Sequence, residues 1–339
     1  MPEADRDAIL VVGPSWVGDM VMAQSLFKLL KAARPHTAID VLAPAWSLPI
    51  VARMPEVRQG IASGTAHGKL GLKDRRALAK ELHHNNYTQA IVLPRSLKAA
   101  LVPWFADIPK RTGYRGESRY FLINDVRPFD ASLLDQTVKR FVFLGLDGAQ
   151  LPENIPFPKL EVSAERQGRT IESLGLQTDR PVIAMMPGAE YGPAKCWPLQ
   201  HFAALAAKLD ASGFDVWVMG SAKDADAGDT IAADSAAINI CGKTELEDVV
   251  DLLGFAEQAV SNDSGLMHIA AAVGCHVQAI YGSSSPRFTP PLTDRRSMHY
   301  LDLDCSPCFK RECPLGHLDC LRKLGVSEVF SDILDNRAN

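Results

Sequence analysis

Short apolar runs rich in β-branched residues alternate along the chain with longer segments of helical periodicity. This alternation is typical of parallel sheets whose strands are joined by crossover helices. In the first half it predicts strands at residues 8–12, 39–42 and 90–93, and helices at 17–33, 75–84 and 96–105. In the second half it predicts strands at 182–186, 216–219, 238–241, 259–261 and 277–281, and helices at 199–210, 225–234, 245–254 and 264–273.

A proline-rich stretch, LPENIPFPKLEVS at residues 151–163, separates the two patterns. Proline disfavours regular structure, so this stretch marks the end of a first domain. We expect the chain to cross into the second domain near residues 177–180, which gives domains of residues 1–177 and 178–339. The predicted fold is α/β, with two Rossmann-like parallel-sheet domains that face a cleft, and such a pair binds its ligands at the carboxyl ends of the strands.

Length and composition fit a globular protein of two domains. The chain has 339 residues, of which 47% are hydrophobic and 22% are charged. No stretch reaches the roughly 18 apolar residues that a membrane-spanning helix needs. The N-terminus, MPEADRDAIL, is acidic and polar where a signal peptide is basic and then apolar. We therefore expect a cytoplasmic protein.

The net charge of −4 argues against nucleic acid as a partner. The charge is unevenly spread, because residues 1–178 carry a net +5 and residues 179–339 a net −9. This asymmetry favours the first half as the place where an anionic partner docks. A chance imbalance between two solvated surfaces explains it equally well.

The first segment that could carry a functional residue is GPSWVGDM, Gly13 to Met20, which follows a predicted strand and begins a predicted helix. Gly13 and Gly18 have the spacing of a phosphate loop, but Asp19 stands where that loop needs lysine. A carboxylate at a helix N-terminus is stabilised in its ionised form, so Asp19 is a possible general base. The alternative is a helix-capping aspartate without a catalytic role.

Two further strand ends favour an anion site in the second half. PGAEYGPAKCWP, Pro187 to Pro198, combines small residues with Lys195, whose charge suits a phosphate; the alternative is a rigid loop with a solvated lysine. In SNDSGLMH, Ser261 to His268, Asp263 and Ser264 can cap a helix, and Gly265 admits a ligand to its first-turn N–H groups. His268 lies one turn on, although a histidine in that position is often structural and the run NDSG also suits an ordinary cap.

Two strand-to-helix turns give weaker signals. In VMGSAKD, Asp224 can accept hydrogen bonds from ribose hydroxyls, and in CGKTELED, Gly242 and Thr244 can frame a base. A plain turn explains each of them as well.

Four of the seven cysteines gather in DCSPCFKRECPLGHLDC, at Cys305, Cys308, Cys313 and Cys320. In a cytosolic protein a C-x-x-C pair favours metal or redox chemistry over disulfides. The later spacings match no common zinc template, so a bound metal and a set of free thiols both remain open.

Several of these motifs together resemble the lipopolysaccharide ADP-heptose heptosyltransferase family, with its type II members the nearest match. The resemblance rests on GPSWVGDMVMAQSL, DVLAPAW, MPEV, PGAEYGPAKCWP, GSAKD, NDSGLMHIAAA and YGSSSPRFTPPL, and it runs from about Ile9 to Leu292. It implies a GT-B fold and transfer of L-glycero-D-manno-heptose from ADP-heptose to the first heptose of the inner core, with inversion and without a catalytic metal or other cofactor. The cysteine-rich tail departs from this pattern and leaves open a structural metal there.

The resemblance also implies roles for individual residues. Asp19 is the expected general base, with Ser15 and Trp16 near the reacting centre. Lys195 is expected to neutralise the diphosphate. The remaining expected donor-binding residues are Asp224, Gly242, Thr244, Asp263, Ser264, Gly265 and His268.

The acceptor implied by the resemblance is a heptosylated Kdo-lipid A, a large anionic glycolipid. The basic segment of residues 95–119 suits such an acceptor, and the expected contacts are Arg95, Lys98, Arg115 and Arg119. The same segment suits a peripheral position of the protein on the inner face of the inner membrane. A solvated charged surface is the alternative. Other possible functions are a type I or III heptosyltransferase, a sugar-nucleotide epimerase, or a metal- or redox-sensing protein built on the cysteine cluster.

Overall fold

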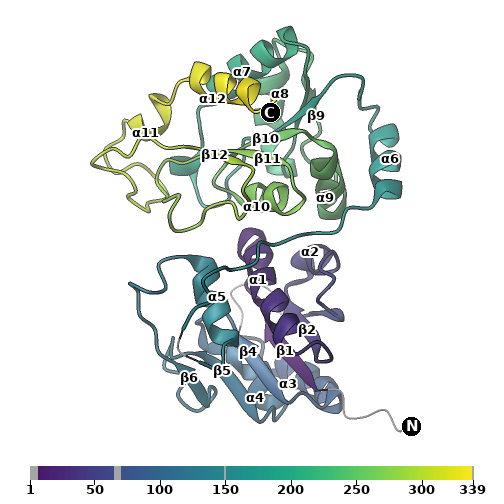
Figure 1. The fold of residues 1–339 in the computed structure, drawn as a ribbon, viewed down its shortest axis with the longest axis vertical. Helices are drawn as coiled ribbons and strands as arrows, with labels where there is room; N and C mark the ends of the chain where they lie inside the picture. The colour runs from purple at the N-terminus through teal and green to yellow at the C-terminus, as the bar shows by residue number, and fades with distance from the viewer. Residues whose placement is uncertain (1–6, 65–69, 149, 338–339) are drawn as a thin grey trace. The chain divides into compact units, whose positions relative to one another are not determined.

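The chain folds into two compact units, Met1–Pro158 and Lys159–Asn339. The computed structural model describes residues 7–64, 70–148 and 150–337. The division lies inside the proline-rich stretch, not at residues 177 and 178 where the sequence placed it. Each unit is an α/β layer structure of its own (Figure 1).

The difference in the boundary comes from helix α6 (Ala164–Ser173), which packs on α9 (Leu246–Phe255) of the second unit. The Ser163 N–H donates to Asp251 Oδ1 at 2.7 Å, and Arg166 donates to Asp248 Oδ1 at 2.8 Å. Asp251 is fully buried, so this contact ties the start of α6 into the second unit.

The sheet of the first unit has six parallel strands in the order β3-β2-β1-β4-β5-β6. The strands are β1 (Ala8–Val12), β2 (Ala38–Ala43), β3 (Gln59–Ala62), β4 (Gln89–Val92), β5 (Lys110–Tyr114) and β6 (Asp125–Arg127). Strand order reverses between β1 and β4, which pair in parallel. In open parallel sheets such a switch point is where ligands bind.

Helices cover both faces of this sheet. They are α1 (Val17–Ala33), α2 (Leu48–Val51), α3 (Leu72–Leu82), α4 (Leu101–Phe105) and α5 (Thr137–Gly145). Helices α1 and α5 pack on each other, and α3 packs on α4. Successive residues of β1 point to opposite faces, so Ala8, Leu10 and Val12 join the core under α3. The whole strand is buried because both faces are covered.

The second unit repeats the same strand order, β12-β11-β10-β7-β8-β9, read from the other edge. Its strands are β7 (Val182–Met186), β8 (Asp215–Val218), β9 (Ile238–Asn239), β10 (Gln258–Asn262), β11 (His276–Ile280) and β12 (Arg296–His299). Its remaining helices are α7 (Leu199–Ala211), α8 (Ala225–Ala232), α10 (Gly265–Ala272), α11 (Asp319–Arg322) and α12 (Val326–Asp335). The switch point here lies between β7 and β10.

Every predicted strand and helix overlaps an element of the structure, which confirms the two-sheet prediction. Strands β3, β5, β6 and β12 and helices α2, α5, α6, α11 and α12 were not predicted. None of the helices within the described ranges is both long enough and apolar enough to cross a bilayer.

Candidate functional site

Two loops of the second unit meet at its switch point and bring Lys195 to Asp263. Lys195 closes a short 3-10 turn (Pro193–Lys195) that follows β7, and Asp263 follows β10 directly. The Lys195 Nζ donates to Asp263 Oδ2 at 2.6 Å, and the two side chains are 17% and 5% exposed. Lys195 also lies over the ring of Tyr191, 5.0 Å from its centroid. The structure thus brings together two of the predicted donor-binding residues as an ion pair.

Asn262, at the end of β10, fixes the loop that carries Lys195. Its side-chain amide donates to the Pro187 carbonyl at 2.6 Å, and its Oδ1 accepts from the Trp197 N–H at 2.9 Å. Trp197 is buried in the core and donates its indole N–H to the Leu324 carbonyl. Sequence reasoning missed Asn262 as a positioning residue, although a buried amide beside a strand end is a usable signal because it requires partners.

Helix α10 begins at this site with its first-turn N–H groups uncapped by a side chain. Ser264 is its N-cap residue but makes no side-chain capping bond, and its hydroxyl lies 3.2 Å from that of Ser261. The Asp263 carboxylate pairs with Lys195. The predicted side-chain cap is therefore absent at Ser264, and the N–H groups after Gly265 are suited to an anion.

His268 is buried one turn into α10 and is neutral at physiological pH. Burial lowers its pKa to about 4; the nearby Lys195 lowers it as well, and Asp263 opposes the shift. A neutral imidazole adds no positive charge to the site. His268 can therefore donate or accept a hydrogen bond but does not neutralise a phosphate.

Asp224 is engaged in local structure beside the same loop. Its Oδ2 accepts from the Ser221 N–H at 2.8 Å and from the Ser221 hydroxyl at 2.7 Å, and the Ser221 side chain accepts from the Asp224 N–H, which completes a capping box. A Cβ at Gly188 or Gly220 would lie within 2.9 Å of the Asp224 side chain, so both positions need glycine. The structure shows Asp224 as the residue that closes these turns, and contact with a ribose stays a prediction.

Gly242 and Thr244 lie in the next turn of the same sheet edge. Gly242 has a φ of +72°, and a Cβ there would lie 2.7 Å from the Ala222 Cα. Among the described residues, the Thr244 hydroxyl is buried without a hydrogen-bond partner, as are those of Ser283 and Ser284 after β11. Buried hydroxyls of this kind are normally satisfied, so a ligand at this edge is a natural partner for them. Ser283 and Ser284 were missed as site residues although the run YGSSS is visible in the sequence.

In the first unit, Asp19 lies in the first turn of α1, directly after β1. It is half-buried, whereas Ser15 and Trp16 are exposed. The Trp46 indole N–H donates to the Ser15 carbonyl at 3.2 Å, and Trp46 is itself 49% exposed. Two exposed indoles therefore flank the loop that leads into α1 and Asp19, and Trp46 was not predicted.

The predicted basic contacts of the first unit divide into surface and buried groups. Arg95 and Arg115 are exposed and lie over the rings of Phe129 and Tyr120, at 4.8 and 5.0 Å, while Lys98 is half-buried. Arg119 is only 1% exposed. The prediction that Arg119 contacts an acceptor at the surface is therefore wrong.

Arg119 is instead a buried positioning residue. Its guanidinium donates to the carbonyls of Tyr114, Arg115, Pro94 and Ser96 at 2.7–3.2 Å. These bonds join the loop after β4 to the loop after β5. Burial lowers its pKa to about 10, so it remains charged and keeps all its donors. Arg119 thus holds the two loops that present Arg95 and Arg115.

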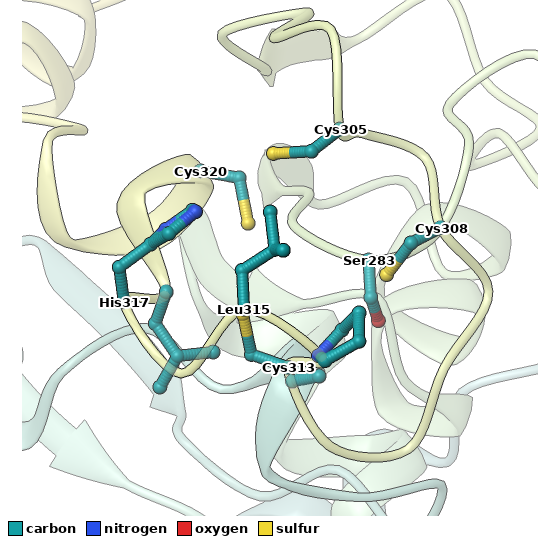
Figure 2. A pocket seen from close by; sticks show the side chains of 10 residues that line it. Ser283, Cys305, Cys308, Cys313, Leu315, His317 and Cys320 are labelled. Carbon is teal, nitrogen blue, oxygen red and sulfur yellow. The ribbon is translucent and has the colours of Figure 1, made fainter.

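The four clustered cysteines line one pocket at the end of the second unit (Figure 2). Cys305, Cys308, Cys313 and Cys320 are all free thiols. Hydrogen bonds from the backbone N–H groups of residues 315–318 lower the pKa of the Cys313 thiol. Within the described residues, no group of three or more His, Cys, Asp or Glu side chains is placed so that it could hold a metal ion.

Comparisons with known proteins agree with the fold. Residues 75–319 match the model of glycosyltransferase family 9, the heptosyltransferases. The chain is 46% identical over 337 residues to lipopolysaccharide heptosyltransferase 2 of Escherichia coli K12, which covers 96% of this chain and 97% of that protein. It is 44% identical over 304 residues to lipooligosaccharide heptosyltransferase 2 of Haemophilus influenzae, an alignment that covers 86% of this chain and 87% of that protein.

Solved structures give the same result. The structure of Escherichia coli ADP-heptose lipopolysaccharide heptosyltransferase II has a TM-score of 0.88 and 41% identity, with 97% of this chain and 98% of that chain covered. An Escherichia coli heptosyltransferase determined with ADP has a TM-score of 0.71 at 20% identity and covers 97% and 99%, which shows a shared fold. The two Rossmann-like units are those of a GT-B glycosyltransferase, as predicted. The chain belongs to glycosyltransferase family 9.

We expect His268 to make the fold sensitive to acid. Its pKa is near 6.5 in the unfolded chain and about 4 in the folded one, so between these values the unfolded state binds more protons. Stability is therefore retained above pH 6.5 and lost as the pH falls toward 4, by up to about 3 kcal/mol. Denaturant unfolding at pH 7 and pH 4.5 measures this loss in the wild type and in His268→Gln.

The free energy of unfolding of His268→Gln should fall less between pH 7 and pH 4.5 than that of the wild type. The matched control is His84→Gln, at an exposed histidine, which should keep the wild-type drop. An unchanged drop in His268→Gln would show that another group titrates.

Proposed function

We propose that this protein transfers L-glycero-D-manno-heptose from ADP-heptose to the first heptose of the lipopolysaccharide inner core, with inversion at the anomeric carbon. The observation that carries the proposal is the meeting of Lys195 and the uncapped start of α10 at the switch point of a chain 46% identical to a type 2 heptosyltransferase. Type 3 and type 1 relatives match at 24% over 290 residues and 27% over 146 residues, so type II is favoured.

The second unit supplies the stabilisation of the leaving group. As the bond between heptose and ADP breaks, negative charge grows on the diphosphate. Lys195 and the first-turn N–H groups of α10 can stabilise that charge, and neither needs a metal ion. Asp263 repels phosphate, so its role is to hold the Lys195 ammonium in place and to accept a hydrogen bond from a sugar hydroxyl. Gly242 and the Thr244 hydroxyl are assigned to the adenosine part.

The first unit supplies the base. Asp19 removes the proton from the acceptor hydroxyl, and the oxygen then attacks the anomeric carbon from the side opposite to ADP. The start of α1 favours the ionised carboxylate, which is the form a base needs. Trp16 and Trp46 provide exposed aromatic faces on which a sugar ring can lie.

Asp19→Asn should keep ADP binding and lose most of the turnover. Loss of a general base typically lowers the rate by about 10² to 10⁴. ADP release in the presence of acceptor measures turnover, and calorimetry measures ADP affinity. Glu56→Gln, at a carboxylate that pairs with Lys28 in the same unit, is the control and should remain near the wild-type rate. A rate for Asp19→Asn within a few-fold of the wild type would remove Asp19 from the mechanism.

Lys195→Ala and Asp263→Asn should separate the two members of the ion pair. A charge-assisted bond to phosphate contributes roughly 1.5–3 kcal/mol, so Lys195→Ala should weaken ADP binding by about tenfold to a hundredfold. Asp263→Asn removes a repelling charge and should weaken ADP binding much less. The control is Lys208→Ala, at an exposed lysine of α7. Equal ADP affinity in wild type and Lys195→Ala by calorimetry would contradict the assignment.

We assign the acceptor to the first unit, on the surface of Arg95, Lys98 and Arg115. Tyr120 and Phe121 lie beside Arg115 in sequence and are 57% and 88% exposed. Basic side chains interleaved with exposed aromatic rings suit an anionic glycolipid at a membrane surface. We therefore propose that the enzyme works at the cytoplasmic face of the inner membrane, attached peripherally, with no nucleic-acid partner.

Arg115→Glu and Arg119→Gln should fail in different ways. Arg115→Glu should raise the acceptor KM, most clearly at low salt because screening acts within about 8 Å at physiological salt, and leave the donor KM unchanged. Arg119→Gln removes several charge-assisted bonds to carbonyls and should lower the free energy of unfolding by at least about 3 kcal/mol. Steady-state kinetics and denaturant unfolding separate the two effects. A raised donor KM alone in Arg115→Glu would move the acceptor surface elsewhere.

The deciding assay supplies ADP-heptose with defined truncated lipopolysaccharide acceptors and follows both ADP release and the glycolipid product. A type I or type III enzyme prefers a different acceptor, and an epimerase changes the donor without any acceptor. Turnover should not increase when Mg²⁺ or Mn²⁺ is added. Abolition by EDTA with rescue by either ion would show a metal-dependent donor site.

A further inference from the structure

The segment from Tyr300 to Leu318 contains no helix or strand. Two of its large apolar side chains, Phe309 and Leu315, are 50% and 61% exposed. Leu301, Leu303 and Leu318 pack against the core, but residues 307–316 are mostly exposed, so burial offsets little of the entropy of holding that part in one conformation. Its four cysteines, by contrast, all line one pocket (Figure 2).

The pocket has the chemistry of a soft metal site. Its polar lining consists of four sulfur atoms, the Ser283 hydroxyl and the His317 ring. His317 Nδ1 accepts a bond from the Asp319 N–H at 3.0 Å, so this nitrogen is engaged within its own turn. No carboxylate lines the pocket. Four thiolates without hard oxygen ligands select zinc or iron over magnesium and calcium.

The turn after Cys313 is tight and holds this cysteine at the pocket. Gly316 has a φ of +73°, and its N–H donates to the Cys313 carbonyl at 3.1 Å, which closes the turn. The other three cysteines lie on both sides of this turn in the chain.

The cysteine segment also supports the loop that carries Lys195. The Ala194 N–H donates to the Arg311 carbonyl at 3.0 Å, and the Tyr191 hydroxyl donates to the Phe309 carbonyl at 2.9 Å. A Cβ at Gly192 would lie 2.6 Å from the Arg311 carbonyl oxygen, so the two segments are in close contact. The conformation of the cysteine segment therefore directly affects the position of the Lys195 loop.

We propose that Cys305, Cys308, Cys313 and Cys320 bind one zinc ion as a tetrathiolate site, which braces the Lys195 loop from outside the reaction centre. The thiols lose their protons on binding, and the four side chains have to move from the positions they take in this structure to reach zinc–sulfur distances of about 2.3 Å. The role of the brace in donor binding rests on the proposed function, whereas the metal site does not.

Metal content tests the site directly. The full-length protein purified without chelator should contain about one zinc per chain by elemental analysis. Replacement by Co²⁺ should give the thiolate-to-cobalt charge-transfer and tetrahedral d–d absorption bands. Cys308→Ser and Cys313→Ser should lose both the metal and the bands, while Cys196→Ser, at a half-buried cysteine outside the cluster, should keep them. Iron in place of zinc, or a chain that takes up neither zinc nor cobalt, would overturn the proposal.

A second measurement avoids variants that fail to fold. Titration of the wild-type holoprotein with a mercurial thiol reagent should release the zinc, detected with a chromogenic chelator, as the cluster thiols react. Zinc that stays bound after all reactive thiols are modified would place it elsewhere and contradict the site.

The brace is tested by ADP binding. Protein stripped of zinc should bind ADP several-fold more weakly and recover on addition of zinc, but not of Mg²⁺. Unchanged ADP affinity with the zinc site otherwise confirmed would overturn the brace alone. Failure of heptose transfer with intact zinc binding would overturn the proposed function alone.

Discussion

The ion pair between Lys195 and Asp263 is the contact on which the donor half of the site depends. An ammonium and a carboxylate that are largely removed from water lose hydration, and only close geometry with further hydrogen bonds offsets that loss. The 2.6 Å separation supplies the geometry. Asn262 does not bond to the pair itself, but its bonds to Pro187 and Trp197 fix the loop on both sides of Lys195 and so reduce the entropy lost when the ammonium is held in place. A pair held in this way gives an arriving diphosphate a cation whose position is already set, so little ordering is left for the moment of binding.

The strand order explains why these particular residues meet. Strands β7 and β10 are adjacent although 71 residues separate their ends in the chain, Met186 and Gln258, from one another. The strand order reverses between them, and the loops that follow them meet at this switch point, where Lys195 pairs with Asp263. The same order in the first unit places Asp19 after β1, beside the loop after β4. One topology, used twice, therefore puts the proposed base and the proposed leaving-group site at equivalent edges of two sheets.

The sequence predicted the buried central strands because a short, continuous apolar run such as residues 8–12 is typical of a strand covered on both faces. It did not predict β6, which has three residues, or β3, whose residues are mostly exposed, because a short edge strand leaves no periodic pattern. It drew the domain boundary after residues 164–173 because helix α6 was not predicted: none of its residues is buried, and its contacts with Asp248 and Asp251 cannot be read from the sequence pattern. Arg119 was misassigned for a related reason: composition reveals a basic segment but not which guanidinium faces backbone carbonyls.

The net charge of each unit is a poor guide to where an anion binds. The second unit, residues 159–339, has a net charge of −9, yet the site best suited to a diphosphate lies in it. Part of this acidity is used locally, since Asp210 and Asp215 pair with Arg180, and Asp248 pairs with Arg166. Paired carboxylates create little field at a distance, whereas Lys195 and the start of α10 act at contact range. A large glycolipid, whose charges spread over many ångströms, is governed instead by the broader field, and this is the physical reason to assign it to the positive first unit.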